Sequence, residues 1–388
     1  MKKTILFLST IIIVYVGCQE RSPSKYNYQS PDKLDDGIEV GTLSDVNIDS
    51  VLLAEAVDSI YQEVYKEIHS LLIYKDEKLV FEEYFAGHQF KYDTTNHHGK
   101  LVNFDRSTLH PVMSVTKSVT STCIGIAVDL GFIESINQSI FDFLPEYDHF
   151  KKNGKEKITI EHLLRMSSGL DWNEWALPYG NPKNDVIQMA ISDDPVEFYL
   201  NKPLIDEPGT SFKYSGGCNI LLGKILEHAT KMTIDEFSGK YLFGPLGIEP
   251  YYWAQYESGT IDGAGGLQLT PRAMVKIGAT FLNKGIWGGK RIISEEWVDK
   301  STVSYPGNSW MNNWDDYWGM RGYGYMWWTH TFTRGAQRID MYYAAGWGGQ
   351  FVMVIPALNT VVVFTEGNYL SYRPAFEILK KYIIPAIN

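Results

Sequence analysis

The chain has 388 residues, of which 44% are hydrophobic and 14% aromatic, so it can bury a large core and is neither disordered nor fibrous. Its formal net charge of -11 argues against a nucleic-acid partner and against binding to an anionic membrane surface. The cysteines are too few for a disulfide framework. We expect Cys123 and Cys218 to be free, buried thiols, and a bridge between them is the alternative.

Residues 1–17 have the pattern of an export signal, with lysines before an apolar run at 5–16 that is too short to span a bilayer comfortably. Gly17-Cys18 ends this run and resembles the end of a bacterial lipoprotein signal, in which Cys18 becomes the lipidated first residue. An ordinary cleaved signal is the alternative. We therefore expect an exported protein of the cell envelope, facing the periplasm or the cell surface, with a lipid on Cys18 as its only membrane attachment.

Residues 18–48 are polar and lack an apolar period, which predicts a flexible tether. The folded part is expected over 49–388, beginning with an amphipathic helix over 51–68. A hairpin should follow, with strands at 71–74 and 79–81 joined by a charged turn.

Residues 86–112 are expected to form a loop that leads to Ser114, which has Lys117 three residues later. Residues three apart share a helix face, so the lysine amine can reach the serine hydroxyl. Apolar residues recur every three or four positions over 115–130 and Gly131 follows, which predicts a helix with Ser114 in its first turn. A lysine kept neutral by desolvation could take the serine proton. The alternative is a buried helix serine beside a solvated lysine.

The middle of the chain, from Gly131 to about residue 300, is predicted to be mainly helical. The clearest helical stretches are 160–166, 187–190, 220–228 and 270–283. From Tyr323 the pattern changes to short β-branched and aromatic runs, which predict an antiparallel meander. Its strands are expected at 323–332, 339–345, 350–355 and 360–365, with a closing helix at 374–384.

Strand patterns on both sides of the helical region predict one sheet assembled from both ends of the chain. The sheet part would comprise residues 49–112 and 301–388, and the mainly helical part residues 113–300. The fold class is therefore α+β, with an antiparallel sheet flanked by helices.

Short phrases spread along the chain resemble those of the serine β-lactamase and penicillin-binding-protein superfamily. They lie at residues 110–118, 160–170, 214–217, 265–271 and 346–350. The closest resemblance is to the branch of class C β-lactamases, related esterases and 6-aminohexanoate-dimer hydrolase, and it covers about residues 50–388. It implies the β-lactamase/transpeptidase-like fold, an active site where sheet and helical part meet, and no metal or cofactor.

The second motif of that superfamily is a tyrosine followed two residues later by asparagine, and Tyr214 falls on the tyrosine. The resemblance implies that Tyr214, beside Lys117, exchanges a proton with the leaving group and then with the attacking water. Gly216 stands where the asparagine is expected, so the amide that steadies the lysine and the substrate is missing. The alternative for Tyr214 is a hydroxyl at a domain seam.

The third motif aligns with Trp347-Gly348-Gly349, on a strand expected to line the active site. The resemblance implies that these glycines let a substrate approach closely and that the N–H groups of Ser114 and Gln350 form the oxyanion hole. A glycine-rich bulge in a strand is the alternative.

By the same resemblance, Asp171, Trp172, Glu174 and Trp175 are expected to form a wall of the pocket. We assign His110 to structure or pocket lining. The adjacent pair His97-His98 would point apart in a strand, so it is expected in a solvated loop and not in a metal site.

The sequence thus predicts a secreted or lipid-anchored serine hydrolase that cleaves a small ester or amide through an acyl-enzyme on Ser114. The alternatives are a D-amino-acid peptidase or β-lactamase, and a non-catalytic ligand-binding homologue. Gly216 and Trp347 stand where the motifs of that superfamily usually have an amide and, often, a cation or an imidazole. Uncharged substrates should therefore be favoured over carboxylates unless an arginine such as Arg321 reaches the site. The sequence does not define the oligomeric state.

Overall fold

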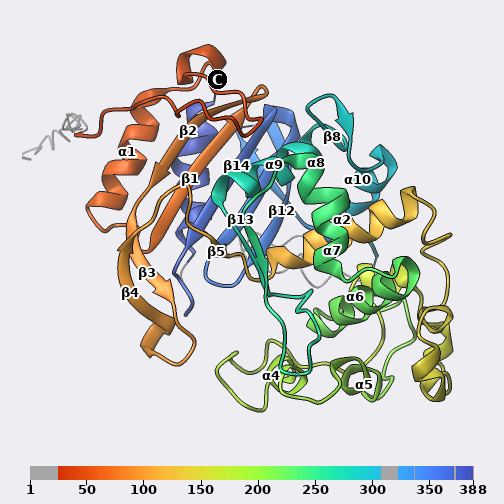
Figure 1. Cartoon of the computed structure of the whole chain (residues 1–388). Coiled ribbons are helices and arrows are strands. Elements are labelled where there is room, and N and C mark those ends of the chain that lie inside the picture. Colours follow the sequence, from red (N-terminus) through yellow and green to blue (C-terminus); the bar gives the residue numbers. More distant parts are fainter. Residues whose placement is uncertain (1–24, 307–321, 336, 371–372, 388) are drawn as a thin grey trace, which may run out of the picture.

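A seven-stranded antiparallel sheet has the order β10-β11-β12-β13-β14-β1-β2. The computed structural model describes residues 25–306, 322–335, 337–370 and 373–387, and it places strands from both ends of the chain side by side (Figure 1). The strands of the sheet are β1 (Ile68–Lys75), β2 (Lys78–Tyr84), β10 (Gly322–Tyr323), β11 (Trp328–Arg334), β12 (Gln337–Gly346), β13 (Gln350–Ile355) and β14 (Thr360–Glu366). The predicted hairpin, the meander and their union in one sheet are confirmed, except that the strand expected at 323–332 is divided into β10 and β11, which pair with each other.

Most of the helices lie in the middle of the chain, as predicted. They are α1 (Ser50–Tyr61), α2 (Val115–Asp129), α3 (Ile160–Leu164), α4 (Asp185–Ala190), α5 (Pro195–Leu200), α6 (Gly216–Thr230), α7 (Ile234–Ser238), α8 (Gly244–Leu246), α9 (Pro271–Leu282), α10 (Glu295–Ser301), α11 (Pro374–Ile378) and α12 (Ile384–Ala386). Helix α2 contacts both α6 and the strands β12 and β13, so it lies between the helical part and the sheet (Figure 1).

Helices cover both faces of the sheet. Phe351 of β13 packs edge-on against Phe376 of α11, with ring centroids 5.3 Å apart, while the next residue, Val352, lies against Gly278 of α9. Successive strand residues point to opposite faces, so α11 and α9 lie on opposite sides of the sheet. Strands β1, β13 and β14 are accordingly buried along their whole length. Helix α9 belongs to this sheet layer, although its residues fall in the range expected for the helical part.

Polar side chains of the buried helix α2 fix its position. Ser118 Oγ donates a hydrogen bond to the carbonyl of Met326 at 2.6 Å, and Thr120 Oγ1 donates to Gly263 at 2.8 Å. A buried hydroxyl is costly without a partner, and these partners lie outside the helix. The alternation of apolar and hydroxyl side chains along α2 therefore anchors this helix in both parts of the fold. Cys123 and Cys218 are free and buried, as expected.

Residues 25–48 are packed against the fold, so the prediction of a flexible tether is wrong for them. The Tyr28 ring stacks on Phe81 of β2 at 6.3 Å, and Arg272 of α9 forms an ion pair with Asp36 at 3.0 Å. The sequence pattern did not indicate this packing, because the segment is held by isolated apolar and acidic residues whose partners lie far away in the sequence. The earlier part of the predicted tether is outside the described residues.

Two further expectations need correction. Helix α1 ends at Tyr61, well before residue 68, and the connection to β1 contains Glu63 and Glu67 with positive φ angles of 58° and 54°. Residues 86–112 are not only a loop. They include the hairpin strands β3 (Ala86–Phe90) and β4 (His98–Asn103), and β5 (His110–Pro111), which pairs with β7 (Leu267–Leu269); β7 also pairs with β6 (Tyr251–Trp253).

A small hairpin, β8 (Ile286–Trp287) with β9 (Lys290–Arg291), follows α9. Within the described part of the chain, no helix combines the length and apolar character needed to cross a membrane. The predicted export signal, Cys18 and Arg321 lie outside the described residues.

Candidate active site

Ser114, Lys117 and Tyr214 come together at the start of α2. Ser114 is the N-cap residue of α2, and the Nζ of Lys117 donates hydrogen bonds to Ser114 Oγ and to the carbonyl of Ala264, each at 2.9 Å. The same Nζ lies 5.0 Å from the centre of the Tyr214 ring. Lys117 is 3% exposed and Tyr214 8% exposed. The predicted catalytic trio is therefore one hydrogen-bonded cluster, in which Lys117 and Tyr214 are buried and Ser114 is half-buried.

The backbone before Ser114 is held in a constrained conformation. Met113 has a positive φ of 49°, a backbone conformation that residues other than glycine adopt only under constraint. A Cβ added to Gly346, at the end of β12, would lie 2.3 Å from the Val112 carbonyl oxygen, so only glycine allows this approach. The end of strand β12 is therefore in close contact with the segment that precedes Ser114.

The pKa of Lys117 shifts in the direction opposite to the one expected from desolvation alone. Desolvation by burial lowers its pKa, but Tyr214, Glu174 and Asp262 together raise the pKa of Lys117 above its ordinary value. Desolvation also raises the pKa of Tyr214, and the Lys117 charge offsets this only in part. Burial and neighbouring charges thus act against each other at this pair: the surrounding acidic groups favour the charged form of Lys117, and desolvation favours the neutral form of Tyr214.

The glycines of the third motif form the turn between β12 and β13 rather than part of a strand. The N–H of Gly349 donates to Gly346 O at 3.2 Å, and Gly348 and Gly349 have positive φ angles of 87° and 97°. Gln350 begins β13 and its side-chain Nε2 donates to Glu366 O at 2.7 Å. The oxyanion role of the backbone N–H groups of Ser114 and Gln350 stays a prediction.

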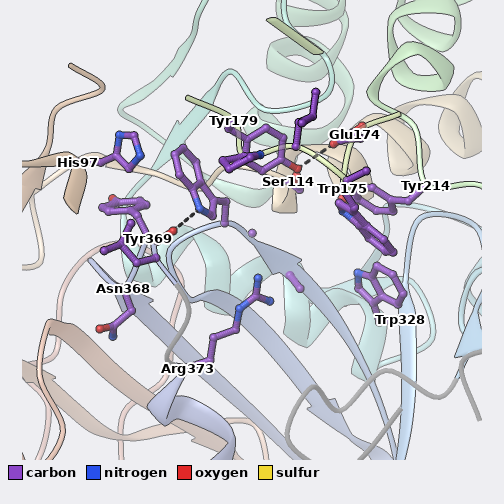
Figure 2. A pocket seen from close by; sticks show the side chains of 17 residues that line it. His97, Ser114, Glu174, Trp175, Tyr179, Tyr214, Trp328, Asn368, Tyr369 and Arg373 are labelled. Carbon is purple, nitrogen blue, oxygen red and sulfur yellow. Dashed lines mark hydrogen bonds between the residues drawn. The ribbon is translucent and has the colours of Figure 1, made fainter. Parts of the chain in front are cut away.

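Ser114 opens into a cavity of about 790 Å³ with two aromatic walls (Figure 2). In one wall the Trp175 ring stacks on Tyr214 at 4.8 Å, and Tyr214 stacks on Trp328 at 5.6 Å. The other wall is centred on Trp347, whose Nε1 donates to the Tyr369 carbonyl at 2.7 Å. The remaining residues that line the cavity are His97, Glu174, Ala176, Leu177, Pro178, Tyr179, Ala345, Gly346, Asn368, Leu370 and Arg373.

Several residues predicted to touch substrate do not line this cavity. Trp172 is buried behind it, and its Nε1 donates to Glu174 at 2.9 Å. Gly216 is also set back, and its N–H donates to Glu174 at 2.7 Å. Gly348 and Gly349 lie in the adjoining turn. Of the predicted substrate contacts, Trp175 and Trp347 line the cavity.

The structure adds side chains that the sequence motifs did not identify. Arg373, just before α11, lines the cavity and extends toward it (Figure 2). Arg373 thus places a cation at the cavity although position 347 carries none, and the buried carboxyl of Glu366 also acts on it. His97 lies in the partly exposed connection between β3 and β4, as expected of a loop, but its ring also meets Trp347 at 4.8 Å and lines the cavity. No local pattern identifies either residue, since both reach the site from distant segments.

A cluster of Glu67, His88 and His98 lies behind this wall, with one potential ligand atom from each within 4.8 Å of the others. The imidazoles of His88 and His98 are stacked at 4.6 Å and are parallel within 1°. One ion cannot lie in both ring planes, so their lone pairs do not converge. His88 Nδ1 is bonded to Glu67 at 2.7 Å and His98 Nε2 to the Gly367 carbonyl at 2.8 Å. Hydrogen bonds therefore hold this cluster together. His98, which was expected in a solvated loop, is instead hydrogen-bonded to the protein.

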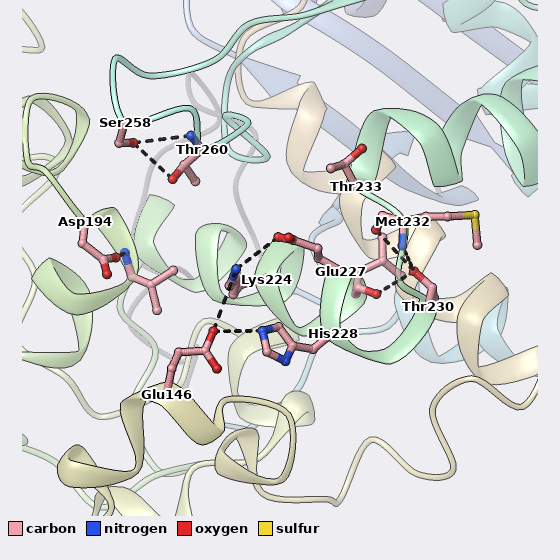
Figure 3. A network of polar contacts seen from close by, with 12 residues as sticks. Glu146, Asp194, Lys224, Glu227, His228, Thr230, Met232, Thr233, Ser258 and Thr260 are labelled. Carbon is pink, nitrogen blue, oxygen red and sulfur yellow. Dashed lines mark hydrogen bonds and ion pairs between the residues drawn. The ribbon is translucent and has the colours of Figure 1, made fainter.

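A second cavity, of about 350 Å³, lies beside α6, and two of its lining residues, Lys224 and Glu227, belong to a network of paired charges. Lys224 is 3.3 Å from Glu227 and 3.9 Å from Glu146, and His228 Nε2 is 2.9 Å from Glu146 (Figure 3). These contacts link α6 to the 3-10 helix Pro145–Phe150. Because the charges satisfy one another, we assign this network to structure.

The antiparallel sheet, the helical part and the serine–lysine pair where they meet define a β-lactamase/transpeptidase-like protein. A model of the Beta-lactamase family matches residues 69–373, and this chain belongs to that family. It is 26% identical over 201 residues to 6-aminohexanoate-dimer hydrolase of Paenarthrobacter ureafaciens, covering 49% of this chain and 50% of that protein. It is 34% identical over 98 residues to lovastatin esterase of Penicillium rubens, covering 24% and 23%.

These matches span about half the length of the curated relatives or less. Among solved structures, the octameric penicillin-binding protein homologue from Pyrococcus abyssi superposes with a TM-score of 0.64, 20% sequence identity, and coverage of 87% of this chain and 77% of that one. This similarity confirms the fold.

Proposed function

We propose that the protein is a serine hydrolase that cleaves small esters or amides through an acyl-enzyme on Ser114. The observation that carries this proposal is the 2.9 Å hydrogen bond between Lys117 Nζ and Ser114 Oγ, beside Tyr214 and open to the aromatic cavity. A nucleophile bonded to a candidate proton acceptor at the edge of a pocket is the arrangement that covalent catalysis needs. The intact trio argues against a non-catalytic binding protein.

In the proposed reaction, the Lys117–Tyr214 pair first loses a proton and then accepts the proton of Ser114. The Oγ of Ser114 bonds to the substrate carbonyl carbon, and the tetrahedral intermediate collapses as the alcohol or amine leaves with that proton. Water, activated by the same pair, then attacks the acyl carbon and releases the acid and free Ser114. No metal or cofactor takes part in this proposal.

The test is an activity screen of the purified protein lacking residues 1–24, beside its Ser114→Ala variant. The panel contains short-chain p-nitrophenyl esters, linear amide oligomers, D-amino-acid amides and a chromogenic cephalosporin. Turnover of an ester or amide that disappears in the variant is the expected result. If the D-amino-acid amide or the cephalosporin is the best substrate, the peptidase or β-lactamase alternative replaces this proposal.

The aromatic walls predict a preference for apolar acyl groups. We expect Trp347→Ala to lower kcat/KM for a 3-phenylpropionyl ester by about 10- to 100-fold, because the indole supplies apolar contact area to a bulky acyl group. An acetyl ester with the same leaving group should lose less than about threefold, since it is too small to reach this wall. Equal losses on both esters would show that Trp347 acts on the turn and not on the acyl group.

We also propose that the protein is exported and anchored through a lipid on Cys18. The support is the short apolar run that ends in Gly17-Cys18. The full chain and its Cys18→Ser variant are expected to differ in detergent partitioning when expressed in a bacterial host, with only the wild type entering the detergent phase. Equal retention of both proteins in the aqueous phase would contradict the anchor.

A further inference from the structure

Glu174 is a buried carboxylate in the wall of the cavity that contains Ser114. It is 4% exposed, and each of its oxygens is hydrogen-bonded. Oε2 accepts from the N–H of Gly216 at 2.7 Å and from Trp172 Nε1 at 2.9 Å, and Oε1 accepts from the Tyr179 hydroxyl at 2.9 Å. Burying a carboxylate is costly, and these neutral donors hold it in place without cancelling its charge.

The carboxylate holds the start of α6, directly after Tyr214. Gly216 is the first residue of this 15-residue helix, whose leading N–H groups have no partner within the helix. An anion is favoured at this end of the helix dipole. A Cβ added to Gly216 would lie 3.5 Å from both Glu174 Oε2 and the Ala264 Cβ, which is an ordinary contact distance. Glu174 thus lies next to the position where the missing amide would be attached.

The negative charge of Glu174 acts on both members of the proton-transfer pair. Desolvation has the largest effect on the pKa of Lys117 and lowers it, Tyr214 has the next largest effect and raises it, and Glu174 comes third and also raises it. The charge of Glu174 raises the pKa of Tyr214 as well. Asp262 acts on Lys117 in the same direction. Among the described residues, the other titratable or hydrogen-bonding groups that face this cluster include Ser114, Tyr179, Cys218, Tyr256, Tyr323 and Arg373.

We propose that Glu174 is a positioning residue for the Lys117–Tyr214 pair: its hydrogen bonds fix the backbone that carries Tyr214, and its negative charge stabilises the Lys117 ammonium. This inference rests on the proposed function. It gives the loop at 171–185 a role in the chemistry that is separate from forming a wall of the cavity. The role is indirect, because both carboxylate oxygens are engaged with the protein itself.

The charge effect is tested with Glu174→Gln. A glutamine oxygen can still accept from Gly216 and Trp172, and its amide can donate to the Tyr179 oxygen, so this variant removes the charge and keeps the contacts. The rate of Ser114 phosphonylation by a fluorophosphonate is measured against pH, together with kcat/KM for a p-nitrophenyl butyrate ester. Both rates should rise with pH in the wild type, since attack needs the deprotonated pair.

In Glu174→Gln the rising limb should move to lower pH by about one unit, because removal of a nearby negative charge lowers the pKa of the pair. The matched control is Asp171→Asn in the same loop. Contrary to expectation, Asp171 does not line the cavity, and its carboxylate pairs with Lys213 at 3.1 Å in a solvent-exposed contact. Its profile should coincide with that of the wild type. A Glu174→Gln profile that also coincides with the wild type would overturn the charge role.

The tethering effect is tested with Glu174→Ala, which also removes the hydrogen bonds. Its rate on the high-pH plateau should be at least about tenfold below that of Glu174→Gln, with a lower unfolding temperature. Equal plateau rates in the two variants would overturn the tether. If the wild type itself is neither labelled nor active, the proposed function fails and this inference fails with it. A labelled wild type with unshifted variants contradicts the inference alone.

Discussion

Replacing Ser114 with alanine should lower kcat for the best ester or amide by at least about 10⁴-fold and abolish labelling by a fluorophosphonate. Loss of a nucleophile removes the covalent route entirely, and only binding and oxyanion contacts remain. The fold should persist, because the substitution removes a half-buried hydroxyl and one hydrogen bond to Lys117, worth about 1 kcal/mol. Intact-mass analysis after labelling should show one adduct on the wild type and none on the variant.

Ser118 provides the matched control. It lies one turn further along α2, and its Oγ is buried and donates to the carbonyl of Met326. Ser118→Ala should lower the free energy of unfolding by about 1 to 3 kcal/mol, because it leaves a buried carbonyl unsatisfied, and it should retain labelling at Ser114. Undiminished labelling in Ser114→Ala would show that another residue is the nucleophile.

Features set by short sequence spacing were predicted well. Helix α2 runs from Val115 to Asp129, and Gly131, whose φ is 76°, follows its C-cap residue Leu130; this extent follows from local periodicity. The contact between Ser114 and Lys117 needs only that residues three apart share a helix face. The meander was predictable for the same reason, since alternation and turn residues are local signals.

Features set by distant contacts were not predictable from these patterns. The upward direction of the Lys117 pKa shift depends on Tyr214, Glu174 and Asp262, which are brought beside it from other segments. Burial alone gave the wrong sign, because desolvation is only one of the opposing effects. Arg373 is likewise a single residue before a short helix, and its place at the cavity depends on the whole sheet being formed.

The second large effect is expected for the Lys117–Tyr214 pair. Lys117→Ala and Tyr214→Phe should each lower kcat by about 10³-fold or more, because each removes a member of one proton path. The double variant should lose little more than the worse single variant, since a path broken once gains nothing from a second break. Rates are measured at the pH optimum of the wild type, with thermal unfolding as the check on the fold.

Lys213→Ala is the matched control for the lysine. Lys213 directly precedes Tyr214, and among the described ion pairs it pairs only with Asp171, in a solvent-exposed contact. It should stay within about threefold of wild-type activity, as an exposed pair contributes little. A double-variant loss equal to the product of the two single losses would mean that Lys117 and Tyr214 act independently. In that case Lys117 would serve Ser114 alone, and the phenol of Tyr214 would act in a separate step on the leaving group or on water.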